Sequence, residues 1–171
     1  PVLSFGYNST SQNGLVGVGW NLSGFSKISR VRKIIAIDGV DGDLTYSSED
    51  RFAFNGKRLL VISGAYGGDG SVYRAELDNF DQVTAKGASG TGPQSFVVQQ
   101  PNGETLVFGG SADSRVLVAA GQETVREWLL SSQTDRNGNQ VVFTYSTDPT
   151  GTGQPGSQAY PIEIAYGGNV G

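Results

Sequence analysis

Histidine, cysteine and methionine are all absent from the 171-residue sequence, and these absences exclude several chemistries at once. Without histidine there is no imidazole base that titrates near neutral pH, so a Ser-His-Asp triad cannot form. Without cysteine there is no thiolate nucleophile, disulfide or thiolate-bound metal. Because the sequence lacks methionine and begins at Pro1, we expect it to be a processed piece or an excerpt of a larger chain.

Charge of either sign is sparse, and hydrophobic runs are short. The sequence has 12 basic and 16 acidic residues, for a net charge of −4. A nucleic-acid surface needs clustered Lys and Arg, so no nucleic-acid partner is expected. No apolar run approaches the roughly 20 residues of a membrane-spanning helix, so no such span is expected. The one basic cluster, Lys27 to Lys33, is interleaved with Ile28 and Val31 and favours a strand with a charged outer face.

Glycine, by contrast, is abundant, with 26 residues. Short runs of β-branched and aromatic residues alternate with Gly, Asn, Asp and Ser turns, which is typical of antiparallel hairpins. We therefore expect an all-β fold of antiparallel, short-stranded sheets, sandwich-like or a segment of an extended β-shell; a closed barrel is the third arrangement that this spacing allows. One strand is expected over 27–37. Residues 123–132 could form a short helix, but Thr124 and Val125 favour a strand there.

Three Asn-Gly pairs predict the positions of tight hairpins. A type I′ turn needs positive φ at both central residues, which Asn and Gly tolerate best. The predicted turns are Asn55-Gly56, Asn102-Gly103 and Asn137-Gly138.

The third turn is expected to act as a structural clamp. Asp135 can accept backbone N–H groups across it, and Asn139 can satisfy a neighbouring carbonyl. The strand that follows places Val141, Phe143 and Tyr145 on one face and Gln140, Val142 and Thr144 on the other. A one-residue slip would therefore invert the buried face. The predicted core residues are Trp20, Trp128, Phe143 and Tyr145.

Candidate metal and catalytic residues are few. Asp38, Asp41 and Asp43 surround two glycines and could offer hard oxygen ligands to Ca²⁺. Asp-Gly pairs are also ordinary hairpin turns, and that interpretation is preferred. Asp50 is expected to pair with Arg51 at the surface. We predict no catalytic residue and no cofactor.

Several blocks of the sequence resemble one known family. They are Leu3 to Ser9, Asn13 to Gly24, Asp50 to Phe52 with Asn55 to Leu59, Gly70 to Phe80, Trp128 to Leu130, Asp135 to Asn139 and Ile164 to Asn169. In this order they resemble the SpvB-type N-terminal domain, which also begins the B components of insecticidal Tc toxin complexes. Residues 135–145 further resemble a YD/RHS repeat, in which a D-x-x-G-N turn leads into a strand ending in Tyr.

The resemblance implies a single SpvB-type N-terminal β module over 1–171. Within it, the Gly, Pro, Ser and Thr content of 147–158 predicts a flexible loop. In that family such strands form a hollow β-shell around a toxic segment. The implied function is a non-catalytic scaffold of a secreted bacterial toxin, whose partners are downstream domains of the same chain and other toxin-complex subunits. The alternative is a β module that recognises glycans or calcium on a target surface, with Trp20 or Trp128 exposed for stacking.

Overall fold

The computed structural model describes residues 25–76, 80–147 and 159–169, together with the backbone of four short N-terminal strands. These four are β1 (Ser4–Tyr7), β2 (Asn13–Gly14), β3 (Gly17–Val18) and β4 (Trp20–Ser23); β1 pairs with β4, and β2 with β3. The expected loop over 147–158, from residue 148 on, and the side chain of Trp20 lie outside the described residues.

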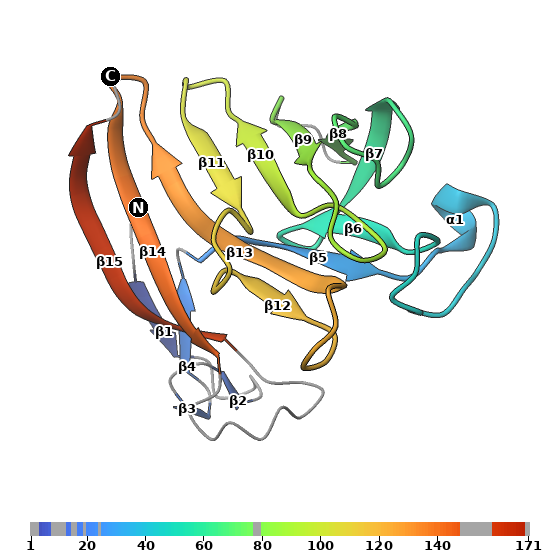
Figure 1. The fold of residues 1–171 in the computed structure, drawn as a ribbon, viewed down its shortest axis with the longest axis horizontal. Coiled ribbons are helices and arrows are strands. Elements are labelled where there is room, and N and C mark those ends of the chain that lie inside the picture. The colour runs from blue at the N-terminus through green and yellow to red at the C-terminus, as the bar shows by residue number, and fades with distance from the viewer. Residues whose placement is uncertain are drawn as a thin grey trace.

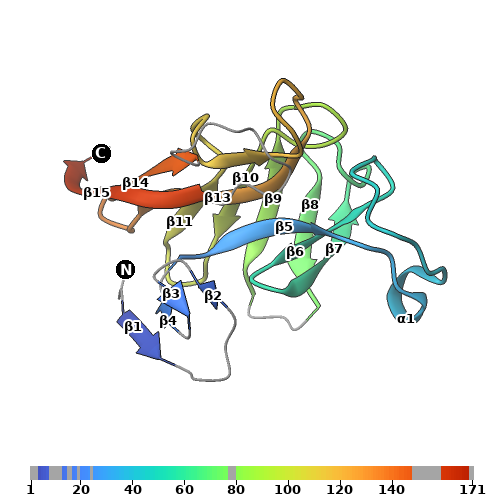
Figure 2. The same cartoon turned by 90° about the horizontal axis from the view of Figure 1, so that it is seen from below.

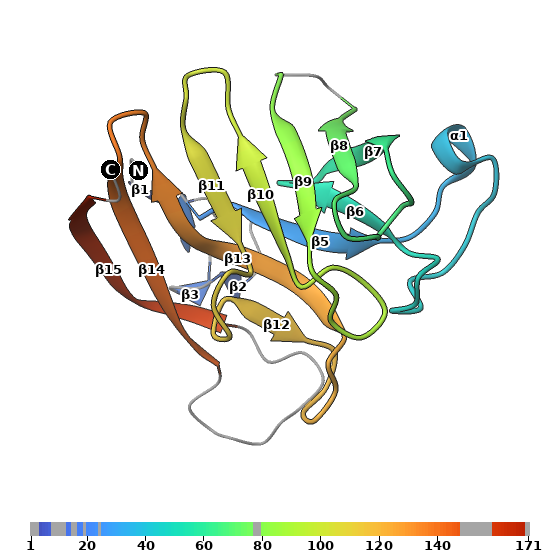
Figure 3. The same ribbon diagram turned by 45° about the horizontal axis from the view of Figure 1, so that its top comes forward.

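All remaining strands belong to one antiparallel sheet (Figures 1–3). Its strands are β5 (Lys27–Val31), β6 (Arg51–Phe54), β7 (Lys57–Ser63), β8 (Val72–Ala75), β9 (Gln82–Lys86), β10 (Ser95–Gln99), β11 (Thr105–Phe108), β12 (Arg115–Leu117), β13 (Val125–Thr134), β14 (Asn139–Thr147) and β15 (Ala159–Asn169). The all-β, antiparallel prediction is confirmed.

The sheet closes on itself, so the sandwich-like arrangement is wrong. Strands β5 to β11 follow one another, and both β5 and β11 pair with β13, which completes an eight-strand barrel. The first half of β13 pairs with β5 and β12, and the second half with β11 and β14. A sandwich would need two separate sheets, whereas this long strand joins both ends of one sheet. β14 and β15 then extend beyond the barrel (Figure 1).

Aromatic side chains fill the barrel. Trp128 is fully buried and meets Phe52 and Phe96 edge-to-face, with ring centroids 5.4 and 5.0 Å apart. Its indole N–H donates to the Pro93 carbonyl at 3.2 Å, so burial leaves its polar atom satisfied. Phe143 and Tyr145 of β14 are also buried, as alternation along that strand requires.

The strand favoured over 123–132 is present as β13, which runs from Val125 to Thr134. Another segment differs in type from the sequence expectation. The strand expected over 27–37 ends at Val31, and α1 (Ile35–Asp38) follows as one helical turn. The Asp38 carboxylate accepts the Ile34 N–H at 2.9 Å, and Gly39 ends the turn at φ 72°. These local bonds outweigh the strand preference of the isoleucines, because propensity yields to context.

The hairpins lie where Asn-Gly pairs stand in the sequence, but only one has the expected dihedrals. Asn55 and Gly56 have φ of 48° and 80°, as a type I′ turn requires, and join β6 to β7. In the β10–β11 and β13–β14 turns only Gly103 and Gly138 have positive φ, at 86° and 82°. These two connections are longer turns in which glycine alone takes the left-handed position.

At Gly109 the backbone passes so close to the Trp128 ring that a side chain would not fit without a shift. Its φ is +70°, and a Cβ there would lie 2.5 Å from Trp128 Cδ1. Gly121 has a similar φ of +77° with nothing within 4 Å. We predict that Gly109→Ala lowers the free energy of unfolding by about 2–4 kcal/mol, and Gly121→Ala by about 1 kcal/mol. Equal losses in denaturant unfolding would show that the contact with the indole costs nothing.

Candidate functional site

A buried arginine is the main polar feature of the barrel interior. Arg30 lies on β5 on the same face as Ile28, and its side chain is 1% exposed. Its Nε donates to the Val125 carbonyl at 2.7 Å. Its guanidinium carbon lies 5.7 Å from the centre of the Phe52 ring and 5.8 Å from that of Trp128. The expectation that the basic cluster forms only a charged outer face is therefore wrong at Arg30.

Asp50 supplies the matching buried charge. Its carboxylate lies 3.4 Å from Arg30 Nη1 and is 1% exposed, and it also accepts the Thr45 N–H at 2.9 Å. Burial lowers the pKa of Arg30, while the charge of Asp50 opposes that shift. The expected pairing of Asp50 with Arg51 is wrong, because Arg51 bonds Asp38 instead, at 2.9 Å.

The same guanidinium holds two loops at one mouth of the barrel. Arg30 donates to the Ser47 carbonyl at 2.7 Å and to Thr91 Oγ1 at 3.2 Å. Thr91 Oγ1 in turn donates to the carbonyl of Tyr46, which has a positive φ of 55°. A surface pocket of about 410 Å³ opens here, lined by Ser47, Ser48, Phe52, Tyr66, Gly67, Ala88, Gly90, Thr91 and Gly92. Every guanidinium nitrogen of Arg30 has a hydrogen-bond partner within the protein, so the role of this charged side chain is to hold the loops in place.

Tyr66 joins β6 and β7 where their ladder ends. The two strands pair only at two positions next to the turn. Beyond them the Tyr66 hydroxyl accepts the Phe52 N–H at 2.7 Å and donates to the Leu59 carbonyl at 3.4 Å. The Tyr66 ring stacks on the Phe52 ring. The guanidinium carbon of Arg51 lies 4.6 Å from the centre of the Tyr66 ring. Burial raises the pKa of this hydroxyl, which therefore stays protonated and can donate.

The three candidate calcium ligands do not converge. Asp38 bonds Arg51 and Arg58, and its side chain is 7% exposed. Asp41 lies 4.0 Å from Arg32 at the surface, and Asp43 is exposed. Within the described ranges no group of three acidic side chains could hold a metal ion. Asp38 instead ties α1 to β6 and β7.

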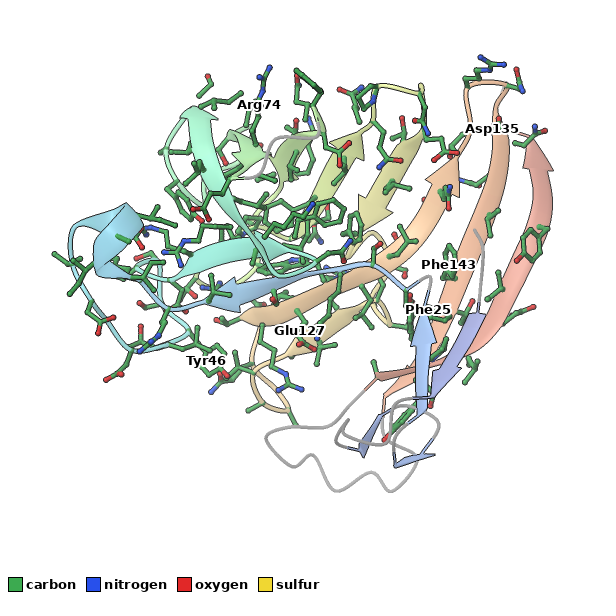
Figure 4. All side chains as sticks on the ribbon, turned by 180° about the vertical axis from the view of Figure 1, so that it is seen from behind. Phe25, Tyr46, Arg74, Glu127, Asp135 and Phe143 are labelled. Atoms are coloured by element: carbon green, nitrogen blue, oxygen red, sulfur yellow. The ribbon has the colours of Figure 1, made fainter. Side chains whose placement is uncertain are left out.

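The Asp135 turn is held by its own carboxylate (Figure 4). Oδ1 accepts the N–H groups of Asn137 and Asn139 at 2.7 and 2.9 Å. Oδ2 accepts the Asn139 side-chain amide at 2.8 Å, so Asn139 bonds this carboxylate and not the neighbouring carbonyl that the sequence suggested. These bonds, the Asn139 side chain first, hold the pKa of Asp135 below its usual range. In the second turn Asn102 Oδ1 accepts the Glu104 N–H in a similar way.

The β14–β15 ribbon offers an open edge. β15 pairs with β14 from Ala159 to Asn169, and no strand of the described part pairs with its other edge. Phe143 faces inward and meets Phe25 edge-to-face at 6.0 Å (Figure 4). On β15, Ile162 and Tyr166 are 64% and 63% exposed. The ribbon is therefore anchored through one strand and presents apolar side chains on the other.

Sequence reasoning missed the roles of Arg30 and Tyr66. Alternation gave a signal for Arg30, because Ile28 and Arg30 must share a face of their strand. Tyr66 lies inside the glycine-rich segment from Gly64 to Gly70, which has no periodic pattern, so nothing local pointed to its hydroxyl bridge.

The sequence matches the family described as "Salmonella virulence plasmid 65kDa B protein" over residues 1–161. A search of curated proteins found no match. Within the described residues, no helix is long and apolar enough to cross a membrane.

Three solved structures are similar over nearly the whole chain. The crystal structure of TcdB2-TccC3-Cdc42 is 19% identical, with 97% of this chain and 9% of that chain covered and a TM-score of 0.74. The N-terminal domain of the effector protein SpvB from Salmonella typhimurium strain LT2 is 18% identical, covering 98% and 59%, with a TM-score of 0.76. The Photorhabdus luminescens Tc holotoxin pore is 20% identical, covering 98% and 8%, with a TM-score of 0.77.

At these identities the structural likeness shows a common fold. This chain spans 59% of the SpvB N-terminal-domain chain and under a tenth of the two Tc toxin chains. The barrel and the family match together define an all-β domain of a family named for a virulence-plasmid protein. The chain belongs to the SpvB family, as its sequence blocks predicted.

The first test of this site concerns the buried ion pair. Asp50→Asn removes the carboxylate charge and leaves the Arg30 guanidinium buried without a counter-charge, so we predict a loss of about 3 kcal/mol in the free energy of unfolding. Glu49→Gln is the matched control in the same loop, because the Glu49 carboxylate bonds Lys33 at the surface. We expect the control to unfold like the wild type. Equal stability of all three proteins in urea would contradict a stabilising role for the pair.

The second test concerns Asp38 and pH. Burial disfavours its ionised form, but the Ile34 N–H, Arg51 and Arg58 outweigh burial and hold its pKa below the usual range. A lowered folded pKa contributes stability above the unfolded pKa of about 3.9, and that stability is lost as pH falls through the folded pKa. We therefore predict that Asp38→Asn is destabilised at pH 7 and that the difference from wild type shrinks below about pH 4.

The measurement for Asp38 is urea unfolding of both proteins between pH 7 and pH 2. Other acidic groups with lowered pKa values, such as Asp113, are present in both proteins and cancel in the difference. A difference that stays constant to pH 2 would show that the charge of Asp38 does not stabilise the α1 attachment.

Proposed function

We propose that this domain is a non-catalytic structural module of a secreted bacterial toxin, and that it contributes to a β-shell that encloses or assembles with a toxic effector domain. The observation that carries the proposal is the open edge of β15. An unpaired strand presents a row of N–H and C=O groups that another strand can pair with.

The construction of the ribbon supports this role. Monomeric proteins shorten, charge or cover their edge strands to prevent pairing between molecules. β15 is 11 residues long and carries Ile162 and Tyr166 exposed, with Glu163 as its one charged residue. β14 is held to the barrel by β13 and by the buried side chains of Phe143 and Tyr145. A rigid barrel thus presents a long strand at a fixed position, as an assembly module requires.

The polar groups of the barrel support a structural role over a catalytic one. Arg30 and Asp50 neutralise each other inside the barrel, and Asp38 is engaged by two arginines. Asp113 accepts the Tyr145 N–H at 2.8 Å and so fixes β14. Each of these groups bonds the fold itself, whereas a catalytic group must be free to reach a substrate.

The partners in this proposal are further strands of the same polypeptide and other subunits of a toxin complex, outside the bacterial cell. The similar structures include Tc toxin assemblies in which the matched part is under a tenth of the chain. For the glycan- or calcium-binding alternative, Trp128 is fully buried and Asp38 is bonded to arginines. Neither residue is placed to contact a surface ligand.

The proposal is tested by placing charge on the edge. Ile162→Lys with Tyr166→Lys should leave the melting temperature of the 171-residue domain unchanged, because both side chains are exposed. In the whole protein expressed from its gene, the same changes should expose β15 to limited proteolysis, with cleavage at least about tenfold faster, since charges would then be buried beside an apolar strand pair.

Leu117→Lys with Val61→Lys is the matched control, because both residues are 39% exposed and lie on other strands. This variant should leave the cleavage rate of the whole protein unchanged. If the β15 variant also behaves like wild type, its edge is not buried in the assembly and the proposal is wrong.

A further inference from the structure

The backbone direction of β14 determines which groups of β15 face the free edge. The Asn139 carbonyl accepts the Asp135 N–H at 2.9 Å beside β13, and the Tyr145 N–H donates to the Asp113 carboxylate at 2.8 Å. Asp113 belongs to the loop between β11 and β12, which both pair with β13. Because backbone groups alternate in direction along a strand, the odd-numbered residues of β14 turn their N–H and C=O groups toward β13 and away from β15.

The residues of β15 opposite these odd-numbered positions turn their own N–H and C=O groups to the free edge. In the pairing register they are Ala159, Pro161, Ile164, Tyr166 and Asn169. Register shifts leave Ile162 and Gly167 as extra residues in β15. Between these two bulges, Ile164 and Tyr166 stand two residues apart, as a regular ladder requires, and each carries an N–H.

Pro161 limits pairing at the other end of this edge. Its backbone faces outward, opposite Tyr145, and it has no N–H to donate. Proline is tolerated on an edge strand at such a position, because no bond to the existing neighbour is lost. The same residue hinders a new strand from pairing there, which is one way in which sheets protect an open edge. The part of the edge that can accept a strand is therefore Ile164 to Tyr166.

The side chains of this part favour an apolar neighbour. Residues opposite each other in a ladder share a face, so Ile164 lies on the inner face with Phe143. Tyr166 lies on the same face, opposite Val141. Ile164 and Val141 pack against the barrel core, whereas Tyr166 is 63% exposed. A strand paired at this edge would place alternate side chains beside Tyr166, and apolar ones would cover its ring.

The order of the strands indicates where such a strand comes from. Each strand from β6 to β11 pairs antiparallel with the strand before it, and so does each strand from β13 to β15. A strand that follows β15 in the whole protein would continue this order on the free side of β15. A hairpin brings that strand first to Tyr166 and then to Ile164.

We infer that the next strand of the whole polypeptide pairs antiparallel with β15 through the N–H and C=O groups of Ile164 and Tyr166, places apolar side chains beside the Tyr166 ring, and stops before Pro161. This inference rests on the assembly role proposed above and specifies the partner strand and its register.

The first experiment measures amide hydrogen exchange at Ala159, Ile164 and Tyr166 in the whole protein expressed from its gene. We expect the Ile164 and Tyr166 amides to exchange at least about a hundredfold more slowly than the Ala159 amide, because only the first two donate to the added strand. If all three exchange rapidly, no strand lies on this edge, and the proposed function fails together with the inference. If Ala159 is as slow as the other two, or if only one of those two is slow, the inference is wrong and the assembly role of β15 stands.

The second experiment compares Tyr166→Pro with Tyr166→Ala in the whole protein. Both variants lose the aromatic side chain, and only the proline variant loses the N–H. We expect the Ile164 amide to exchange at least about tenfold faster in the proline variant than in the alanine variant. Leu130 of β13 should stay equally protected in both, because the Tyr166 N–H faces away from β14 and the barrel. Equal exchange of Ile164 in the two variants, or loss of Leu130 protection in the proline variant alone, would overturn the inference.

Discussion

The pairing of β13 with four other strands is the constraint on which the rest of the structure depends. A β-strand has two edges, and each stretch of it can satisfy two neighbours. β13 is ten residues long and divides its edges between β5 and β12 in its first half and β11 and β14 in its second. A register shift in the β11 ladder skips Ser131 between Leu130 and Ser132 and lets the strand make this change of partners. Without the pairing of β13 to both β5 and β11, the sheet would have open edges at these two strands.

Closure also explains why a charged residue lies in the core. Where the strands meet at the mouth, carbonyls and hydroxyls of several loops point inward, and a single guanidinium with five donors can satisfy many of them. Arg30 does so for Val125, Ser47 and Thr91, with Asp50 as counter-charge. The aromatic rings of Phe52 and Trp128 surround the cation and exclude water from it. The loop that carries α1 is attached by the same means, through Asp38 and two arginines.

Local features of this fold could be predicted from the sequence, and long-range ones could not. The Asn55-Gly56 dihedrals, the Asp135 carboxylate bonds and the inward face of β14 follow from turn chemistry and alternation within a few residues. Closure depends on Leu106 meeting Gln133 and Ser29 meeting Glu127, and no local pattern encodes such pairs. No local pattern encodes the buried ion pair of Arg30 with Asp50 either. The isoleucine-rich run before Asp38 misled strand prediction because a single carboxylate bond to Ile34 outweighed propensity.

A rigid closed barrel that carries a strand ready for pairing is the central claim, and amide hydrogen exchange tests it most directly. Exchange should be compared between the 171-residue domain and the whole protein expressed from its gene. The account predicts that β13 amides such as Leu129 and Leu130 are strongly protected in both proteins. Alternate amides of β15, open in the isolated domain, should become at least about a hundredfold more protected in the whole protein. Equal exchange of the β15 amides in the two proteins, or rapid exchange of β13 in the isolated domain, would contradict the account.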